Sequence, residues 1–254
     1  MPVLQLPRSV PCAALLLILA PAAFAQGSPP MNTDDPGTPG KGGWEFNLAL
    51  SQSRGGGSRD TSAPMFEVNY GVTDTVKLSY ALDWLSSKPA RGRSESGLSN
   101  SEIGAKWRFL DRGKEGAKAS VAPALEFNNP GSNAERKGLA AEGGTFTLPF
   151  QFEQPLGPLA LNLEVGRAFH FKAADEWSYG VAVGGEVSEA VALGMELFGD
   201  AQKNFHRSAL LLNFGASIKV EKNHSLMLAV GRELHRHDGP KATFVGYLGW
   251  QIRR

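Results

Sequence analysis

The feature that most constrains this chain is an alternation of apolar and polar residues with a period of two. Residues 44–51 read WEFNLALS, which puts tryptophan, phenylalanine and leucine on one face and mostly polar residues on the other. Successive side chains of a β-strand point to opposite faces, so this period is typical of a strand between two different surroundings. No stretch of about ten or more residues carries an apolar stripe of helical period with caps. We therefore predict an all-β chain with almost no helix outside its N-terminal segment.

The same alternation recurs in about twelve segments. The predicted strands are Gly43–Gln52, Ala63–Tyr70, Thr75–Leu85, Asn100–Leu110, Ala117–Asn128, Gly144–Gln154, Leu159–Phe169, Glu176–Val187, Val191–Asp200, Ser208–Val220, Ser225–Arg232 and Ala242–Ile252. The predicted short turns are Gly71–Asp74, Asp111–Gly116, Gln154–Pro158, Ser188–Ala190 and Glu221–His224. The predicted longer links are Ser53–Ser62, Ser86–Ser99, Asn129–Gly143, Lys172–Asp175, Ala201–Arg207 and Glu233–Lys241. Short and long connections alternate, as in outer-membrane barrels with tight periplasmic turns and longer external loops.

A soluble β-sandwich is the alternative, because its strands also alternate. The predicted strands are near the length that crosses a bilayer when tilted. Aromatic residues lie near many strand ends, as in interfacial girdles, namely Trp44, Tyr70, Trp84, Phe127, Phe169, Trp177, Phe198 and Trp250. Small and charged residues share the second face, which suits a wet lumen. We therefore predict a transmembrane antiparallel up-and-down β-barrel of about 12 strands with periplasmic N- and C-termini.

The average composition does not reveal that the predicted strands have one apolar and one polar face. The chain has 254 residues, a hydrophobic fraction of 42% and a formal net charge of +1. Its mean hydropathy is −0.21. Alternating lipid-facing and lumen-facing residues average to such neutral values. The balanced charge argues against binding to nucleic acid by phosphate neutralisation, and the apolar content argues against a disordered chain.

The N-terminus has the order of a secretory signal peptide. Residues 13–20 read AALLLILA after the basic Arg8, and Ala23-Phe24-Ala25 follows as a cleavage pattern. The apolar run is shorter than a membrane span. Cys12 precedes the run, so we expect no lipid anchor on it. The predicted organisation is a signal peptide at 1–25, a periplasmic or lumen-entering segment at 26–43 rich in Pro, Gly and Asp, and the barrel at 44–254, exported to the bacterial outer membrane.

Residues 29–45 read PPMNTDDPGTPGKGGWE. This segment resembles the N-terminal signature of a bacterial outer-membrane transporter family labelled MetA-pathway of phenol degradation. The matching positions are Pro29, Pro30, Thr33, Asp34, Asp35, Pro36, Gly40, Gly42, Trp44 and Glu45. The turn at 70–74 and the last strand at 247–252 also resemble that family. The resemblance implies a barrel that passes aromatic or other small compounds and has no catalytic residues.

The end of the chain departs from the usual pattern. Outer-membrane barrels usually end in an aromatic residue read by the assembly machinery, whereas this chain ends Ile252-Arg253-Arg254. Either assembly reads Trp250 and Ile252 instead, or the chain carries a short added tail.

Two clusters have metal-ligating residue types. Asp34-Asp35 resembles a carboxylate pair, but a turn or plug contact is the better interpretation because no third ligand follows at a fixed spacing. His235-Arg236-His237-Asp238 is the densest histidine cluster, but the arginine and the following Gly-Pro favour a solvated loop. We therefore expect no metal and no cofactor.

An envelope lipid hydrolase is a remote alternative. His224 and Ser225 are adjacent, but a hydrolase needs a nucleophile, a base and a third partner that meet in space. Motifs for serine hydrolases, zinc proteases and phosphate-binding loops are absent from the sequence. We therefore expect no enzyme and no catalytic residues.

The predicted lumen face carries charges of both signs. Its members are Glu45, Glu67, Lys77, Asp83, Glu102, Lys106, Arg108, Lys118, Glu126, Glu153, Glu164, Glu196, Asn213 and Lys219. A ring of one sign predicts ion selectivity, whereas mixed charges can pair and fill the lumen. About twelve strands lie between the about eight that side chains fill and the about sixteen that leave a channel. Segment 26–43 is therefore a hypothetical lumen gate.

These observations predict an outer-membrane channel for passive uptake or export of small compounds, aromatic ones included. Its expected partners are outer-membrane lipid and lipopolysaccharide, the barrel-assembly machinery and a small-molecule solute, with no nucleic acid. The alternative is a non-conducting structural or surface-interaction barrel that works through the loops Ser86–Ser99 and Asn129–Gly143.

Overall fold

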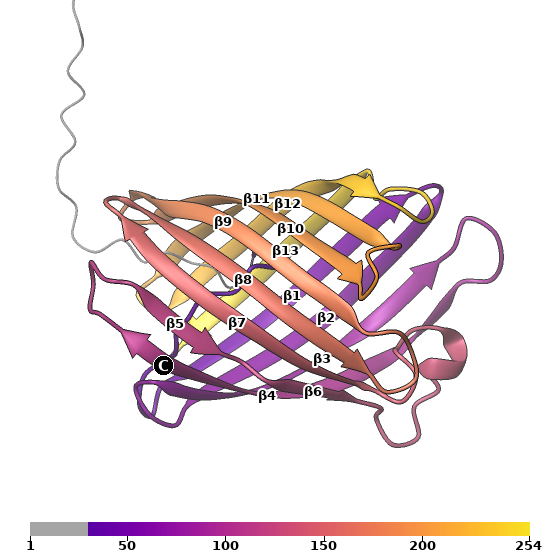
Figure 1. Ribbon diagram of the computed structural model, residues 1–254, viewed down its shortest axis with the longest axis horizontal. Coiled ribbons are helices and arrows are strands. Elements are labelled where there is room, and N and C mark those ends of the chain that lie inside the picture. Colours follow the sequence, from indigo (N-terminus) through magenta and orange to yellow (C-terminus); the bar gives the residue numbers. More distant parts are fainter. Residues whose placement is uncertain (1–29) are drawn as a thin grey trace, which may run out of the picture.

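The computed structural model describes residues 30–254, which form a closed antiparallel β-barrel (Figure 1). The predicted signal peptide at 1–25 and residues 26–29 lie outside the described residues. The strands are β1 (Trp44–Gly55), β2 (Ser58–Gly71), β3 (Val76–Lys88), β4 (Glu95–Asp111), β5 (Lys118–Val121), β6 (Ala124–Phe127), β7 (Thr145–Leu156), β8 (Leu159–His170), β9 (Glu176–Ser188), β10 (Val191–Gln202), β11 (Ser208–Glu221), β12 (His224–Arg236) and β13 (Phe244–Arg253). Within this range the only helix is the 3-10 turn η1 (Glu135–Lys137). The predicted all-β barrel is confirmed.

Two of the thirteen segments share one position in the wall. Both β5 and β6 pair with β4 on one side and β7 on the other, so they count as one strand and the barrel is twelve-stranded. The prediction of one continuous strand at Ala117–Asn128 is therefore wrong at Ala122 and Pro123. Proline has no N–H to give to a ladder. The wall stays bonded there, because Ala105 N–H donates to the Pro123 carbonyl at 3.0 Å and Ala122 N–H to that of Pro149 at 3.0 Å.

Closure occurs between the first and last strands. β1 pairs with β13 from Glu45 opposite Arg253 to Arg54 opposite Phe244. Arg254 continues the pairing, since it exchanges two backbone hydrogen bonds of 2.7 and 2.8 Å with Trp44. The two terminal arginines are thus built into the seam and do not form a separate tail.

The connections divide the barrel into two ends. Turns 72–75, 112–117, 157–158, 189–190 and 222–223 lie at what we call the short-turn end, with the C-terminus. Links 89–94, 128–144, 171–175, 203–207 and 237–243 lie at the long-loop end. The predicted long link Ser53–Ser62 is wrong. β1 and β2 continue as polar strands to a turn made of Gly56 and Gly57, which have φ of 57° and 82°. Backbone pairing persists there although the side chains no longer alternate.

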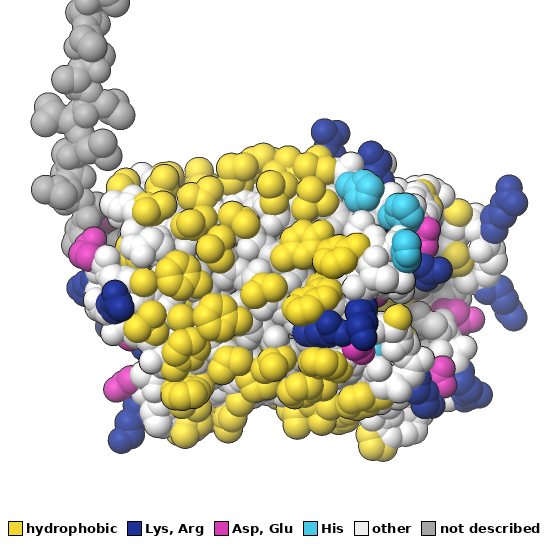
Figure 2. Space-filling model, in the orientation of Figure 1, with side chains coloured by type: hydrophobic (Ala, Val, Ile, Leu, Met, Phe, Trp, Pro, Cys, Tyr) yellow, Lys and Arg dark blue, Asp and Glu magenta, His cyan; other side chains and the backbone are white. Residues whose placement is uncertain are grey.

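The barrel is apolar outside and polar inside. Large exposed side chains on the outer face include Leu48, Phe66, Leu78, Ile103, Trp107, Phe150, Leu163, Val181, Leu193, Phe214, Val230 and Leu248. Hydrophobic side chains cover the face of the barrel seen in Figure 2, and most charges gather at its two ends. Buried polar residues include Asn47, Asn69, Lys106, Gln151, Asn162, Glu196, Asn213 and Gln251. This inverted pattern is the one of a barrel that crosses a bilayer. In the described chain, no helix is long and apolar enough to span a membrane.

The outer face yields a stability prediction. Val181, near the middle of β9, and Val187, near its short-turn end, are 48% and 63% exposed on the outer face. An arginine at mid-bilayer costs about 2–4 kcal/mol and one near the interface about 0–1 kcal/mol. Val181→Arg should therefore lower the free energy of unfolding in lipid vesicles much more than Val187→Arg. Equal losses in guanidinium titrations would contradict the membrane-facing assignment.

Candidate functional site

The segment that precedes β1 lies inside the barrel, and we call residues 30–43 the strap. Its C-terminal part is fixed to the β2–β3 turn at the short-turn end. Lys41 N–H donates to Asp74 Oδ1 at 3.0 Å, and the Thr38 hydroxyl donates to the Asp74 carbonyl at 2.7 Å. Gly42 N–H donates to the carbonyl of Gly71 at 2.7 Å. The strap therefore leads from this end into the lumen.

The N-terminal part of the strap is held by a buried carboxylate on β10. Glu196, which is 1% exposed, accepts hydrogen bonds from Asn32 N–H at 2.9 Å, Asn32 Nδ2 at 3.0 Å and Thr33 N–H at 2.8 Å. Asn213 Nδ2 on β11 donates to the same carboxylate at 3.1 Å. A buried carboxylate is costly without such donors, so the strap satisfies a charge that the wall places in the lumen.

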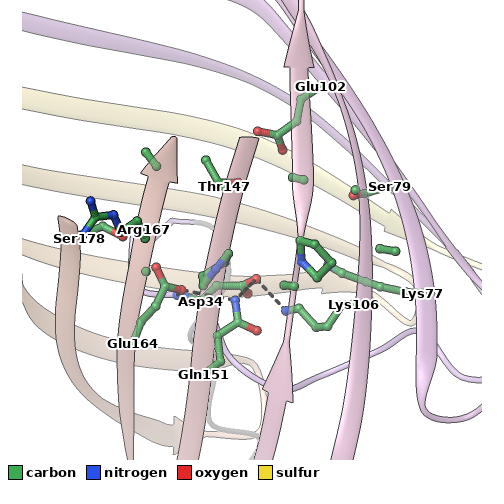
Figure 3. A pocket seen from close by; sticks show the side chains of 18 of the residues that line it. Asp34, Lys77, Ser79, Glu102, Lys106, Thr147, Gln151, Glu164, Arg167 and Ser178 are labelled. Carbon is green, nitrogen blue, oxygen red and sulfur yellow. Dashed lines mark hydrogen bonds and ion pairs between the residues drawn. The ribbon is translucent and has the colours of Figure 1, made fainter. Parts of the chain in front are cut away.

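The middle of the strap is bonded to the wall at β4, β7 and β8 (Figure 3). Asp34 Oδ2 accepts from Lys106 Nζ at 2.6 Å and from Gln151 Nε2 at 3.0 Å. Asp34 N–H donates to Glu164 Oε2 at 3.1 Å. The Lys106 side chain is 1% exposed and also donates to the carbonyl of Asp35. Together with Glu196, these bonds make the strap a bridge between two sides of the lumen.

Glycines make room for the strap on three neighbouring strands. A Cβ added at Gly180 on β9 would strike the side chain of Thr33. One added at Gly194 on β10 or Gly215 on β11 would meet the methyl group of Met31, at 3.0 and 2.7 Å. The inner wall is therefore shaped to the strap at these positions.

Asp35 forms a local turn beside the ion pair. Gly37 N–H donates to Asp35 Oδ1, the arrangement of an Asx turn. Burial raises the pKa of the Asp35 carboxyl to about 6, against the lowering effect of Lys106. Within residues 30–254, no group of three or more His, Cys, Asp or Glu side chains is placed to hold a metal ion.

A cavity of about 350 Å³ lies against the strap. The strap contributes Asn32 and Asp34 to its lining. The wall contributes charged residues, Glu67, Lys77, Glu102, Lys106 and Glu164, and the hydroxyl residues Ser79, Thr147 and Ser178 (Figure 3). None of the residues that line this cavity is aromatic. Its surface thus combines charged and hydrogen-bonding groups with small apolar residues, which include Ala105, Ala122, Pro123, Ala124, Pro149 and Ala168.

Arg167 also borders the cavity, but its guanidinium belongs to the outer face. Its Nη2 pairs with Asp175 at 2.8 Å, and its Cζ lies 5.5 and 4.7 Å from the ring centroids of Phe169 and Trp177. Phe169 and Val165, two positions away on either side along β8, are both exposed on that face. Arg167 therefore adds no charge to the lumen.

The predicted lumen residues occupy different places in the barrel. Glu67, Lys77, Glu102, Lys106 and Glu164 surround the cavity, and Glu196 with Asn213 holds the strap. Glu45 accepts from Arg253 at 2.9 Å, Lys118 pairs with Glu153 at 2.7 Å, and Glu126 accepts from Asn100 at 2.8 Å. Arg108 Nη2 donates to the Asp74 carbonyl at 2.8 Å, and Lys219 Nζ donates to the Glu189 carbonyl at 3.4 Å. Asp83 on β3 lies opposite Met65 on β2.

Sequence reasoning missed the amides between these charges. Gln251 Nε2 donates to Asn47 Oδ1 at 3.1 Å, and Asn47 Nδ2 donates to Glu67 Oε2 at 2.9 Å. Asn69 Nδ2 donates to Glu67 Oε1 at 3.1 Å. These amides occupy inward positions of the same alternation, so the period already marked them, but the prediction selected mainly charged residues.

The two histidine motifs do not assemble a site. His224 Nδ1 accepts from the indole N–H of Trp250 at 3.2 Å, whereas Ser225 lines a small cavity at the short-turn end. Adjacent residues of a strand face opposite ways, so this pair does not form the nucleophile and base of a hydrolase. In the loop cluster, Asp238 pairs with Arg207 at 2.6 Å on the exposed surface.

Comparisons with known proteins place the fold. No protein-family model and no curated protein matches the sequence. The COG4313 outer membrane channel from Pseudomonas putida F1 is similar with a TM-score of 0.66 and 17% identity, over 84% of this chain and 96% of that chain. The KdgM porin is similar with a TM-score of 0.57 and 12% identity, over 81% and 98%. The NanC porin is similar with a TM-score of 0.58 and 7% identity, over 82% and 98%. The shared feature is the outer-membrane barrel fold.

The contacts of the strap predict that a cysteine introduced at Thr33 is protected from labelling. Thr33 is 0% exposed, so a cysteine in Thr33→Cys should react with a maleimide far more slowly than one in Ser94→Cys, a position on an exposed loop. Hydrogen bonds to charged groups contribute about 1.5–3 kcal/mol each. Adding Glu196→Ala should therefore raise the Thr33→Cys labelling rate by about tenfold or more. The same rate with and without Glu196→Ala would mean that this carboxylate does not hold the strap.

Proposed function

We propose that this protein is an outer-membrane channel for small polar solutes and that the strap is its gate. The observation that carries this proposal is a non-wall segment bonded across a polar lumen. Three of its residues, Asn32, Thr33 and Asp34, bond to β4, β7, β8 and β10. A barrel without a channel needs no such separate segment in its lumen, because the side chains of its wall can fill the lumen.

The cavity supports a polar solute. Its volume of about 350 Å³ is at the small end of ligand-sized pockets, about 300–1,000 Å³. Its lining offers carboxylates, amines and hydroxyls and no aromatic ring for stacking. The family resemblance implied aromatic compounds among the solutes, whereas this lining favours compact polar molecules.

The apolar outer face and the two unequal ends of the barrel support its insertion in the outer membrane and its orientation there. The apolar belt fits a bilayer, so lipid is the surrounding partner, and lipopolysaccharide and the barrel-assembly machinery are proposed partners. The short-turn end would face the periplasm, as short turns do in outer-membrane barrels, which puts the C-terminal part of the strap and the C-terminus of the chain on that side. The proposed membership of the MetA-pathway of phenol degradation family rests on its signature. Residues Pro30, Thr33, Asp34, Asp35, Pro36, Gly40 and Gly42 of that signature lie in the strap, and Pro29 lies outside the described residues.

A non-conducting barrel is the second candidate. The bonds of the strap to Glu196, Glu164 and Lys106 favour it, because they occupy the lumen with satisfied polar contacts. Electrical recordings separate the two candidates. No catalytic role is proposed for any residue.

Deleting residues 27–42 should open the channel. The deletion removes the strap and leaves the wall strands intact, so the single-channel conductance in planar bilayers should rise several-fold. Liposome swelling with a size series of neutral solutes should show a larger cut-off for the same variant.

A matched control replaces residues 27–42 by a Gly/Ser segment of equal length. This variant keeps the chain length but loses the contacts of Asn32 and Asp34, so it should conduct like the deletion. An unchanged conductance in both variants would reject the gate, and silence of all three proteins would reject the channel.

A further inference from the structure

The basic residues of the lumen are mostly neutralised by the structure. Lys106 is paired with Asp34 at 2.6 Å, and Lys118 with Glu153 at 2.7 Å. Arg108 is paired with Asp111 at 3.1 Å, close to the short-turn end. Among the described bases that line the cavity and face inward, Lys77 alone has no carboxylate within ion-pair distance. Positive charge is therefore scarce in the cavity.

The acidic residues are held mainly by neutral donors. Glu164 accepts from the backbone N–H of Asp34 at 3.1 Å and from the Gln151 amide at 3.2 Å. Glu67 accepts from the amides of Asn47 at 2.9 Å and Asn69 at 3.1 Å. Neutral donors stabilise a carboxylate without cancelling its charge, so these groups contribute negative potential to the lumen when they are ionised.

Two further carboxylates face each other across strands. Glu102 on β4 is directly opposite Glu126 on β6, and both point inward. Like charges at directly opposite positions destabilise a sheet. Asn100 Nδ2 donates to Glu126 at 2.8 Å, whereas Glu102 has no hydrogen-bond partner within residues 30–254. A wall that keeps such a pair beside a cavity breaks a local rule of sheet stability, as functional sites do.

The charges around the cavity therefore do not balance. With Asp34 and Lys106 paired, three carboxylates, Glu67, Glu102 and Glu164, stand against one ammonium, Lys77, which leaves a formal charge of minus two. Charges of one sign in a narrow lumen with low-dielectric walls concentrate the opposite ion. We propose that this cavity makes the channel selective for small cations, inorganic or organic ammonium ions, and that Glu102 and Glu164 set the selectivity.

The arrangement suits passage and not storage of the cation. Within the described chain, no three acidic or histidine side chains converge on a point where they could chelate a metal ion. Dispersed carboxylates attract a cation without binding it tightly, which conduction requires. The inference rests on the proposed channel function, and it adds the sign of the charge that passes.

The test is the reversal potential in a tenfold KCl gradient at pH 8. It uses the full chain and Glu196→Ala, which loosens the strap but keeps the Asp34–Lys106 pair. The expected permeability ratio of K⁺ to Cl⁻ is about five or more, since two uncompensated charges act in a narrow lumen. Tetramethylammonium in place of K⁺ should still carry current if organic cations pass.

Charge variants locate the effect. Glu102→Gln with Glu164→Gln should lower the ratio about threefold or more, whereas Lys77→Met should raise it. Glu115→Gln, on an exposed turn, should leave the ratio unchanged. Misfolding would not shift the permeability ratio in opposite directions for acidic and basic residues. The folding of each variant is checked independently by its heat-dependent mobility on gels.

The outcomes separate the two proposals. A conducting protein with a ratio near one or below, or with no response to Glu102→Gln and Glu164→Gln, overturns cation selection and leaves the channel in place. Silence of the full chain, of Glu196→Ala and of the variant that lacks residues 27–42 overturns the channel and the selectivity with it.

Discussion

The rest of the structure depends on the closure of the sheet between β1 and β13. In a bilayer no water is available to an unpaired backbone group, so a sheet can cross only when its edges are joined. The seam runs from Trp44 to Arg54, and Arg254 contributes its last two backbone hydrogen bonds. Closure fixes which side of every strand faces lipid. The polar side of each strand is thereby enclosed in a narrow lumen.

Enclosure creates a second constraint, which the strap resolves. Lys106, Gln151 and Glu196 are nearly fully buried on different strands, and buried polar groups need partners. Each finds one on the strap or next to it. The remaining inward amides bond to one another or to Glu67. The lumen is therefore a hydrogen-bonded polar core, interrupted by a cavity where the carboxylates outnumber the bases.

The period of the sequence was sufficient to predict the barrel and most strand positions, because alternation reports directly on the two faces of a wall. It did not predict that β1 continues past Gln52 to Gly55, or that β2 begins at Ser58 and not at Ala63. Both faces of these extensions are polar. It also missed the break at Ala122 and Pro123, because both halves keep the same phase. The contacts of the strap were beyond sequence reasoning for another reason. Asn32 and Glu196 are 164 residues apart, and no periodicity links positions across a lumen.

The position of Glu196 has a consequence for the order of assembly. The strap precedes the first strand, but its seat is built by β9, β10 and β11, which come late in the chain. While a chain is made from its N-terminus, the strap exists long before the carboxylate and the glycines that receive it. It can therefore take up its position only after β9, β10 and β11 have paired. The segment that precedes the first strand is thus among the last to fold.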